Sequence, residues 1–201
     1  MRVVGLTGGI ACGKSTVAGW LKEMGAAIID ADAISHALTA PGGEALPAIF
    51  AAFGNDVRLP GDLLDRQALG SLVFADTEAR GRLNGILHPL IHAHMLAQIA
   101  DCREKGLPIV IMDVPLLYET GMEDLADEVW CVSAPEALQI QRLESRDGLS
   151  RGAAMARIRS QWPLAEKEAR ADAVIDTASP ESETRAKVQR LYSALSKRRE
   201  R

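Results

Sequence analysis

The sequence has few cysteines and no long apolar run. Its three cysteines, Cys12, Cys102 and Cys131, lie far apart and form no CxxC pair, so neither a disulfide framework nor a zinc site is expected. Reduced thiols in a reducing compartment are the natural interpretation. No stretch approaches the roughly 20 apolar residues that cross a bilayer, and the residues before position 8 leave no room for a signal peptide. We therefore expect a cytoplasmic protein with no membrane partner.

An excess of positive charge is absent as well. Lys and Arg total 23 against 27 Asp and Glu, so the formal net charge is -4. A dedicated nucleic-acid-binding protein needs a dominant basic face, and no nucleic-acid partner is expected. With 47% hydrophobic residues over 201 positions, the chain is long enough to bury one core, or one core with a small appendage. We expect a folded monomer or small homo-oligomer.

Short apolar runs alternate with helical segments along the chain. This alternation is typical of an α/β protein with a parallel sheet covered on both faces. Residues 34–105 contain no strand-like run and predict an inserted helical subdomain. Residues 135–170 are helical and rich in arginine, and residues 181–201 predict one amphipathic helix with a frayed end. The expected strands are residues 3–6, 26–29, 108–112, 128–132 and 173–175.

One motif predicts a phosphate-binding loop. Residues 8–15 read GGIACGKS, which fits G-x-x-x-x-G-K-[ST], with an expected strand before and a helix after. Glycines let successive backbone N–H groups surround an anion at a helix N-terminus. Lys14 would reach the β- and γ-phosphates, the Ser15 hydroxyl would ligate Mg²⁺, and Thr16 would contact the α-phosphate. The predicted ATP-binding residues are Gly8, Gly9, Ile10, Ala11, Cys12, Gly13, Lys14, Ser15 and Thr16, with Cys12 as a small filler rather than a reactive thiol.

The remaining motifs favour transfer to a bound acceptor over hydrolysis. A guanine-reading Asn-Lys-x-Asp element is absent, which disfavours a GTPase. Motor ATPases place an Asp-Glu pair at the end of an apolar strand, whereas Asp113 is followed by Val114 and Pro115. A kinase is therefore the leading interpretation, and a nucleotide switch that transfers nothing is an alternative.

Two acidic residues mark the expected acceptor side. Asp30 and Asp32 follow the second strand, at the edge where open α/β sheets bind their ligands. A carboxylate there can accept the proton of an acceptor hydroxyl, or hold Mg²⁺ through water. The competing interpretation is that one of them only caps the next helix, and Asp30 is the stronger candidate for that structural role.

A series of landmarks runs along most of the chain. They are residues 5–16, Ile29-Asp30-Ala31-Asp32, Leu64-Asp65-Arg66, His88-Pro89, Pro115-Leu116-Leu117-Tyr118-Glu119, Gln139-Ile140-Gln141-Arg142 and Ala171-Asp172. Together they resemble the dephospho-CoA kinase family. The resemblance implies ATP-dependent phosphorylation of the ribose 3'-hydroxyl of dephospho-CoA, the last step of coenzyme A synthesis. It also implies a three-layer P-loop kinase fold with a core at about 1–33, 106–134 and 171–201, a helical CoA-side insertion at about 34–105 and a small helical lid at about 135–170.

The resemblance implies a role for particular residues. Asp32 would be the catalytic base, Lys14 and Arg142 would balance phosphoryl charge, and Arg146 would join Arg142 in the lid beside ATP. Two places depart from the family pattern: the loop before Leu64 is shifted by one residue, and residues 174–177 lack the usual asparagine. The implied acceptor-binding residues are Asp32, Leu64, Asp65, Arg66, His88, Pro115 and Leu116.

Several residues have a plainer interpretation. Arg151 and Arg157 are expected on a solvated face. The spacing of His88, His92 and His94 resembles that of metal ligands, but Pro89 disfavours a regular helix through His88 and no carboxylate motif accompanies them. The tryptophans Trp20, Trp130 and Trp162 are interpreted as core or interface anchors, with Trp162 placed to move on lid closure.

An alternative function stays open: the protein is a kinase for another small hydroxyl acceptor, such as a nucleoside or a shikimate-like acid.

Overall fold

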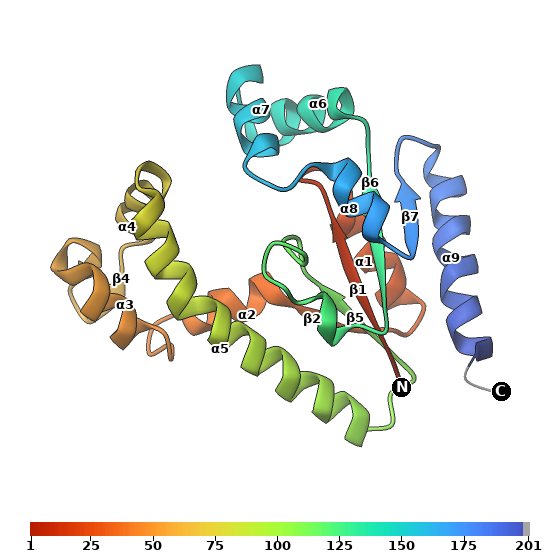
Figure 1. Ribbon diagram of the computed structural model, residues 1–201, viewed down its shortest axis with the longest axis horizontal. Helices are drawn as coiled ribbons and strands as arrows, with labels where there is room; N and C mark the ends of the chain where they lie inside the picture. Colours follow the sequence, from red (N-terminus) through yellow and green to blue (C-terminus); the bar gives the residue numbers. More distant parts are fainter. Residues whose placement is uncertain (199–201) are drawn as a thin grey trace. The chain divides into compact units, whose positions relative to one another are not determined.

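The computed structural model, which describes residues 1–198, contains a five-stranded sheet (Figure 1). The strand order is β2-β5-β1-β6-β7, and β1 pairs in parallel with both β5 and β6, as β6 does with β7. All five strands match runs expected from the sequence, which confirms the α/β prediction. The strands are β1 (Arg2–Gly8), β2 (Ala27–Asp30), β5 (Ile109–Asp113), β6 (Glu128–Ser133) and β7 (Ala173–Asp176).

The contacts divide the chain into two units, Met1–Ile29 with Ile99–Arg201, and Asp30–Gln98. In the first unit, buried side chains of β1, β5 and β6 form a core with α1, α9 and α8. β-Branched and other apolar residues fill both faces of these strands, as a covered parallel sheet requires. The helices of this unit are α1 (Lys14–Glu23), η2 (Glu123–Leu125), α6 (Glu136–Asp147), α7 (Arg151–Arg159), α8 (Leu164–Arg170) and α9 (Glu181–Arg198).

The C-terminal helix prediction is confirmed as far as the structure reaches. Helix α9 packs against α1, and Val188 and Leu195 contribute to the core. The frayed end expected at residues 197–199 is corrected in part, because α9 continues through Lys197 and Arg198; residues 199–201 lie outside the described residues. Within residues 1–198 no helix has the length and apolarity needed to span a bilayer.

The second unit is mostly helical, with one small exception. Its elements are α2 (Ala31–Leu38), α3 (Leu46–Phe53), η1 (Gly54–Val57), β3 (Arg58–Leu59), β4 (Leu63–Leu64), α4 (Arg66–Ala75) and most of α5 (Thr77–Glu104). The antiparallel pair β3–β4 corrects the expectation that this stretch holds no strand. Strands of two residues show no alternating pattern, and the hairpin depends on a turn in which Gly61 and Asp62 both have positive φ.

Helix α5 corrects a second expectation. It runs without interruption from Thr77 to Glu104 with Pro89 inside it, so His88 lies within a helix. A proline removes one helical hydrogen bond and costs about 3 kcal/mol in a helix interior. Buried side chains on both sides of the proline, including Ala79 and Met95, stabilise the helix by packing, which a local rule on proline does not count.

At Gly8, strand β1 leaves no room for a side chain beside β6. A Cβ atom built there would lie 2.3 Å from the carbonyl oxygen of Val132, its partner on β6. Gly8→Ala is therefore expected to cost about 1–3 kcal/mol of stability through overpacking, lowering the melting temperature by about 3–10 °C. Gly19→Ala in α1 is the matched control, because a Cβ atom at Gly19 would point into open space. Equal melting temperatures of the two variants would contradict the predicted clash.

Candidate active site

The loop between β1 and α1 has the expected strand–loop–helix arrangement. Gly13 is the N-cap of α1 with a left-handed φ of 89°, a conformation that favours glycine. Its carbonyl oxygen accepts hydrogen bonds from the backbone N–H groups of Thr16 and Val17, which begins the helix. The hydroxyl-bearing residues Ser15 and Thr16 are exposed in the first turn. The N–H groups and the dipole at this helix N-terminus form a site for an anion.

Lys14 is held by a carboxylate that the sequence analysis did not assign to the site. Its Nζ forms an ion pair with Oδ1 of Asp113, and the two side chains are 15% and 9% exposed. Asp113 is the last residue of β5, which lies beside β1 in the sheet. The sequence signal that could have identified Asp113 is an acidic residue at the end of an apolar strand. The strand order, which places it beside the phosphate loop, is not visible in the sequence.

Arg142 contacts the backbone of the loop. From helix α6 its Nη1 donates to the carbonyl oxygen of Ala11 at 3.0 Å, and its two Nη atoms donate to the hydroxyl and carbonyl oxygens of Thr177 at 3.0 Å each. The Thr177 hydroxyl in turn donates to the Cys12 carbonyl oxygen at 2.7 Å. The guanidinium is therefore adjacent to the loop backbone. Thr177, which the sequence left without an assigned contact, is a second site residue that it missed.

The other arginines of α6 and α7 have different partners. Arg146 forms an exposed ion pair with Asp147 at 2.7 Å, and Arg157 approaches the same carboxylate at 3.4 Å. The hydrogen bond from Arg146 is the main cause that lowers the pKa of Asp147. The exposed positions of Arg151 and Arg157 confirm the solvated face. Because Arg146 is paired with its own neighbour rather than with the loop, its assignment to ATP stays a prediction.

Cys12 is buried inside the loop. Burial raises the pKa of its thiol to about 11, and the same cause raises the pKa of Cys131 to about 12. A thiol with a raised pKa carries little thiolate near neutral pH and is a poor nucleophile. Both facts agree with Cys12 as a filler of the loop. The third thiol, Cys102, is buried as well.

The two acids after β2 have different roles. The Asp30 carboxylate caps α2 by accepting hydrogen bonds from the backbone N–H groups of Asp32 and Ala33, at 2.8 and 3.0 Å. This confirms Asp30 as the structural member of the pair. The Asp32 side chain is exposed in the first turn of α2 and makes no hydrogen bond or ion pair within residues 1–198. Its carboxylate is therefore available for chemistry.

The expected acceptor residues of the second unit have structural contacts of their own. Asp65 caps α4 by accepting from the Ala68 N–H at 2.9 Å, and Arg66 donates to the Thr39 carbonyl oxygen at 3.1 Å. Leu64 ends the β3–β4 hairpin. His88 is partly buried, and burial lowers its pKa.

The last two expected acceptor residues, Pro115 and Leu116, belong to the first unit. The Pro115 carbonyl oxygen accepts from the Thr7 hydroxyl at 3.0 Å, and Leu116 is 39% exposed. His94 pairs with Glu44 at 2.8 Å. Among the residues that the structure describes, no group of three or more metal-ligating side chains gathers around these histidines.

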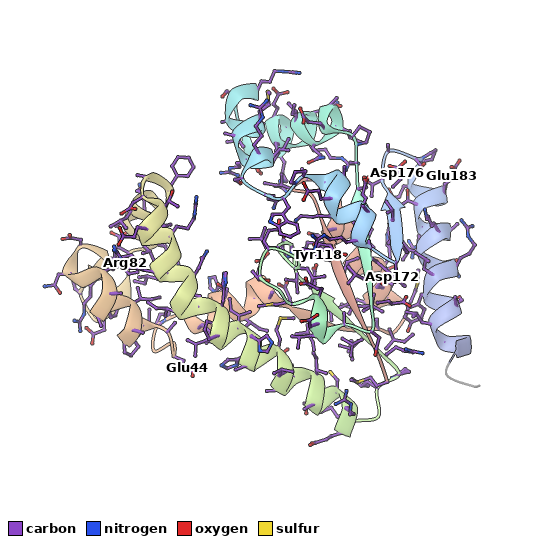
Figure 2. The ribbon with its side chains drawn as sticks, viewed as in Figure 1. Glu44, Arg82, Tyr118, Asp172, Asp176 and Glu183 are labelled. Carbon is purple, nitrogen blue, oxygen red and sulfur yellow. The ribbon has the colours of Figure 1, made fainter. Side chains whose placement is uncertain are left out.

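The three tryptophans are placed as anchors. Trp20 and Trp130 are buried in the core, with the Trp130 ring N–H donating to Glu128. Trp162 stacks on Tyr118 with ring centroids 6.4 Å apart and planes 9° apart. Tyr118 is labelled in Figure 2. Arg170 lies over both rings, 4.8 Å from the Trp162 centroid and 6.0 Å from that of Tyr118.

A parallel sheet whose first strand enters a lysine-bearing phosphate loop, with an acid from the neighbouring strand on that lysine, defines a P-loop phosphotransferase. Residues 2–183 match the model of the dephospho-CoA kinase family, and the chain belongs to this family. A dephospho-CoA kinase from Symbiobacterium thermophilum is 48% identical over 194 residues, which cover 96% of this chain and 81% of the relative.

Solved structures agree with this assignment. A dephospho-CoA kinase from Campylobacter jejuni has a TM-score of 0.74 at 31% identity over 97% of both chains. The crystal structure of TT1252 from Thermus thermophilus has a TM-score of 0.82 at 32% identity over 96% of both chains. The family resemblance and the P-loop kinase fold expected from the sequence are thereby confirmed. The boundaries of the insertion and the lid stay predictions.

Proposed function

We propose that this protein transfers the γ-phosphoryl group of ATP to the ribose 3'-hydroxyl of dephospho-CoA, giving coenzyme A and ADP. The observation that carries the proposal is the phosphate loop with Lys14 held by Asp113, in a chain of the dephospho-CoA kinase family. We place the reaction in the cytoplasm, in a monomer or small homo-oligomer without a nucleic-acid or membrane partner.

Phosphoryl transfer needs positive charge on the transferring group. In the proposed reaction the loop at residues 8–16 surrounds the phosphates, the backbone N–H groups that have no partner within the protein donate to them, and Lys14 supplies a cation. Arg142 stands against the same loop and would balance charge from the other side, with Arg146 reaching ATP from the end of α6. Because these donors are fixed by the fold, they stabilise the charge as it develops without reorganising first.

The residues around Lys14 fit a magnesium ion. The Ser15 hydroxyl is exposed beside Lys14, and the Asp113 carboxylate lies against that lysine. Mg²⁺ takes one or two protein oxygens and completes its shell with water and phosphate oxygens, so Ser15 and Asp113 would hold it, with Asp32 as a further contributor through water. When bound, the ion would neutralise negative charge on the phosphates of ATP.

The acceptor hydroxyl needs a base. The Asp32 carboxylate is exposed and makes no hydrogen bond or ion pair within residues 1–198, while Asp30 caps α2. We assign Asp32 to accept the 3'-hydroxyl proton as the oxygen attacks the γ-phosphorus. The residues proposed to bind the acceptor are Leu64, Asp65, Arg66, His88, Pro115 and Leu116. Asp65 and Arg66 would contribute chiefly by ordering α4 and α2, through their hydrogen bonds with the Ala68 N–H and the Thr39 carbonyl oxygen.

An acceptor panel tests the proposal. ADP release from ATP would be followed with dephospho-CoA, adenosine and other nucleosides, and shikimate, each at the same concentration. Dephospho-CoA is expected to accelerate ADP release at least about a hundredfold over buffer, because only a fitted acceptor places its hydroxyl for in-line attack. Faster release with a nucleoside or shikimate would assign a different acceptor, and acceptor-independent release would indicate a nucleotide switch.

A further inference from the structure

A ring of contacts joins the phosphate loop to the segment between α7 and α8. We propose that Gln161 is a positioning residue of the phosphate loop, and that the ion pair between the partly buried Glu119 and the buried Lys167 holds it in place. All of these residues belong to the first unit. The inference rests on the proposed function only in taking the loop as the site of ATP phosphates.

The first contact is made with the loop itself. The Ile10 backbone N–H donates to Oε1 of Gln161 at 2.8 Å. A carboxamide oxygen satisfies this N–H without a formal negative charge, whereas a carboxylate in its place would repel the phosphates. Gln161 thus fixes one turn of the loop at no electrostatic cost to ATP.

The second set of contacts fixes the residue next to Gln161. The backbone N–H of Trp162 donates to Oε1 of Glu119 at 3.0 Å. Its ring stacks on Tyr118, and Arg170 covers both rings. One backbone hydrogen bond and two ring contacts therefore restrict the position from which the Gln161 side chain reaches Ile10.

Lys167 connects Glu119 to the residue that precedes the phosphate loop. Its side chain is fully buried, and its Nζ lies 2.7 Å from Glu119 Oε1 and 3.1 Å from the Pro115 carbonyl oxygen. The same carbonyl oxygen accepts the hydroxyl of Thr7, the residue before Gly8. The contacts thus meet the loop on both sides, at Thr7 and at Ile10. Apolar residues often replace a buried ion pair without loss of stability, so stability alone does not account for this pair.

Nucleotide affinity of Gln161 variants tests the first part. Gln161→Leu removes the acceptor for Ile10 and is expected to weaken ATP binding about three- to tenfold, the range of one hydrogen bond. Gln161→Glu keeps an acceptor but adds charge, and is expected to weaken ATP binding at least about tenfold while the melting temperature stays within a few degrees. Gln141→Leu, an exposed position on α6, is the control. Wild-type affinity in both Gln161 variants would overturn the proposal.

A double variant tests the buried pair. Lys167→Met alone leaves the Glu119 carboxylate without its cation and is expected to destabilise the protein strongly. Glu119→Gln with Lys167→Met removes both charges and keeps an oxygen for the Trp162 N–H. We expect near-native melting, ATP binding weakened about three- to tenfold, and little further loss when Gln161→Leu is added, because the residues act as one unit.

Two outcomes would overturn the role of the pair. Wild-type ATP affinity in the double variant would make Glu119 and Lys167 structural only. Failure of the double variant to fold would make the pair a requirement for folding rather than for positioning. Since ATP affinity is measured by calorimetry without any acceptor, failure of the wild-type protein to phosphorylate dephospho-CoA would refute the proposed function and leave this test intact.

Discussion

Replacing Lys14 by alanine is expected to lower kcat/KM for phosphoryl transfer about 10²–10³-fold, the usual effect of losing one charged donor to a transition state. The ammonium lies at the start of α1 and is paired with the carboxylate of Asp113. Negative charge spreads over the phosphoryl oxygens as the bond to ADP breaks. A steady-state assay with ATP and dephospho-CoA measures the loss.

Stability has to be separated from catalysis in this variant. Removing Lys14 takes one cation from the buried Asp113 carboxylate, so the melting temperature is expected to fall, as it usually does when a buried carboxylate loses its cation. Lys22→Ala is the matched control, because Lys22 is an exposed lysine on the same helix. The account is contradicted if Lys14→Ala and Lys22→Ala have the same kcat/KM at a temperature where both are folded.

Replacing Asp32 by asparagine is expected to lower kcat about 10²–10⁴-fold, the range measured for the loss of a general base. Asparagine keeps the size of the side chain but does not accept the hydroxyl proton. Because the Asp32 side chain makes no hydrogen bond or ion pair within residues 1–198 that stabilises the fold, the affinities for ATP and dephospho-CoA are expected to change little. Single-turnover kinetics with calorimetric titration of both ligands would separate chemistry from binding.

Asp30→Asn provides the control for the base. Asparagine caps helices about as well as aspartate, so the hydrogen bonds to Asp32 and Ala33 are expected to persist and kcat to stay near that of wild type. A near-normal kcat for Asp32→Asn would remove Asp32 from the base role. A larger loss in Asp30→Asn than in Asp32→Asn would exchange the two roles.

The local parts of the site were predictable from the sequence, because they depend on residues that are neighbours in the chain. The loop at residues 8–15, its flanking strand and helix, and the capping role of Asp30 follow from motif and propensity. The positions of Asp113 and Thr177 beside the phosphate loop depend on the strand order β2-β5-β1-β6-β7, which brings distant strand ends together. No local pattern carries that order.

Buried charge and packing explain the remaining differences. Lys167 belongs to a basic helical stretch of the kind that is usually solvated, yet its side chain is fully buried against Glu119. Pro89 is of a residue type that usually ends a helix, yet α5 continues through it. In both cases tertiary packing outweighs the local rule, and for Lys167 the partner, Glu119, lies far away in the sequence.

The position of the transferred phosphate tests the central claim most directly. The protein would be incubated with ATP and dephospho-CoA, and the product analysed by ³¹P nuclear magnetic resonance and mass spectrometry. The account predicts one ADP for each new phosphomonoester, with the ester on the ribose 3'-oxygen. ADP with free inorganic phosphate and unchanged dephospho-CoA, or an ester on another oxygen, would contradict it.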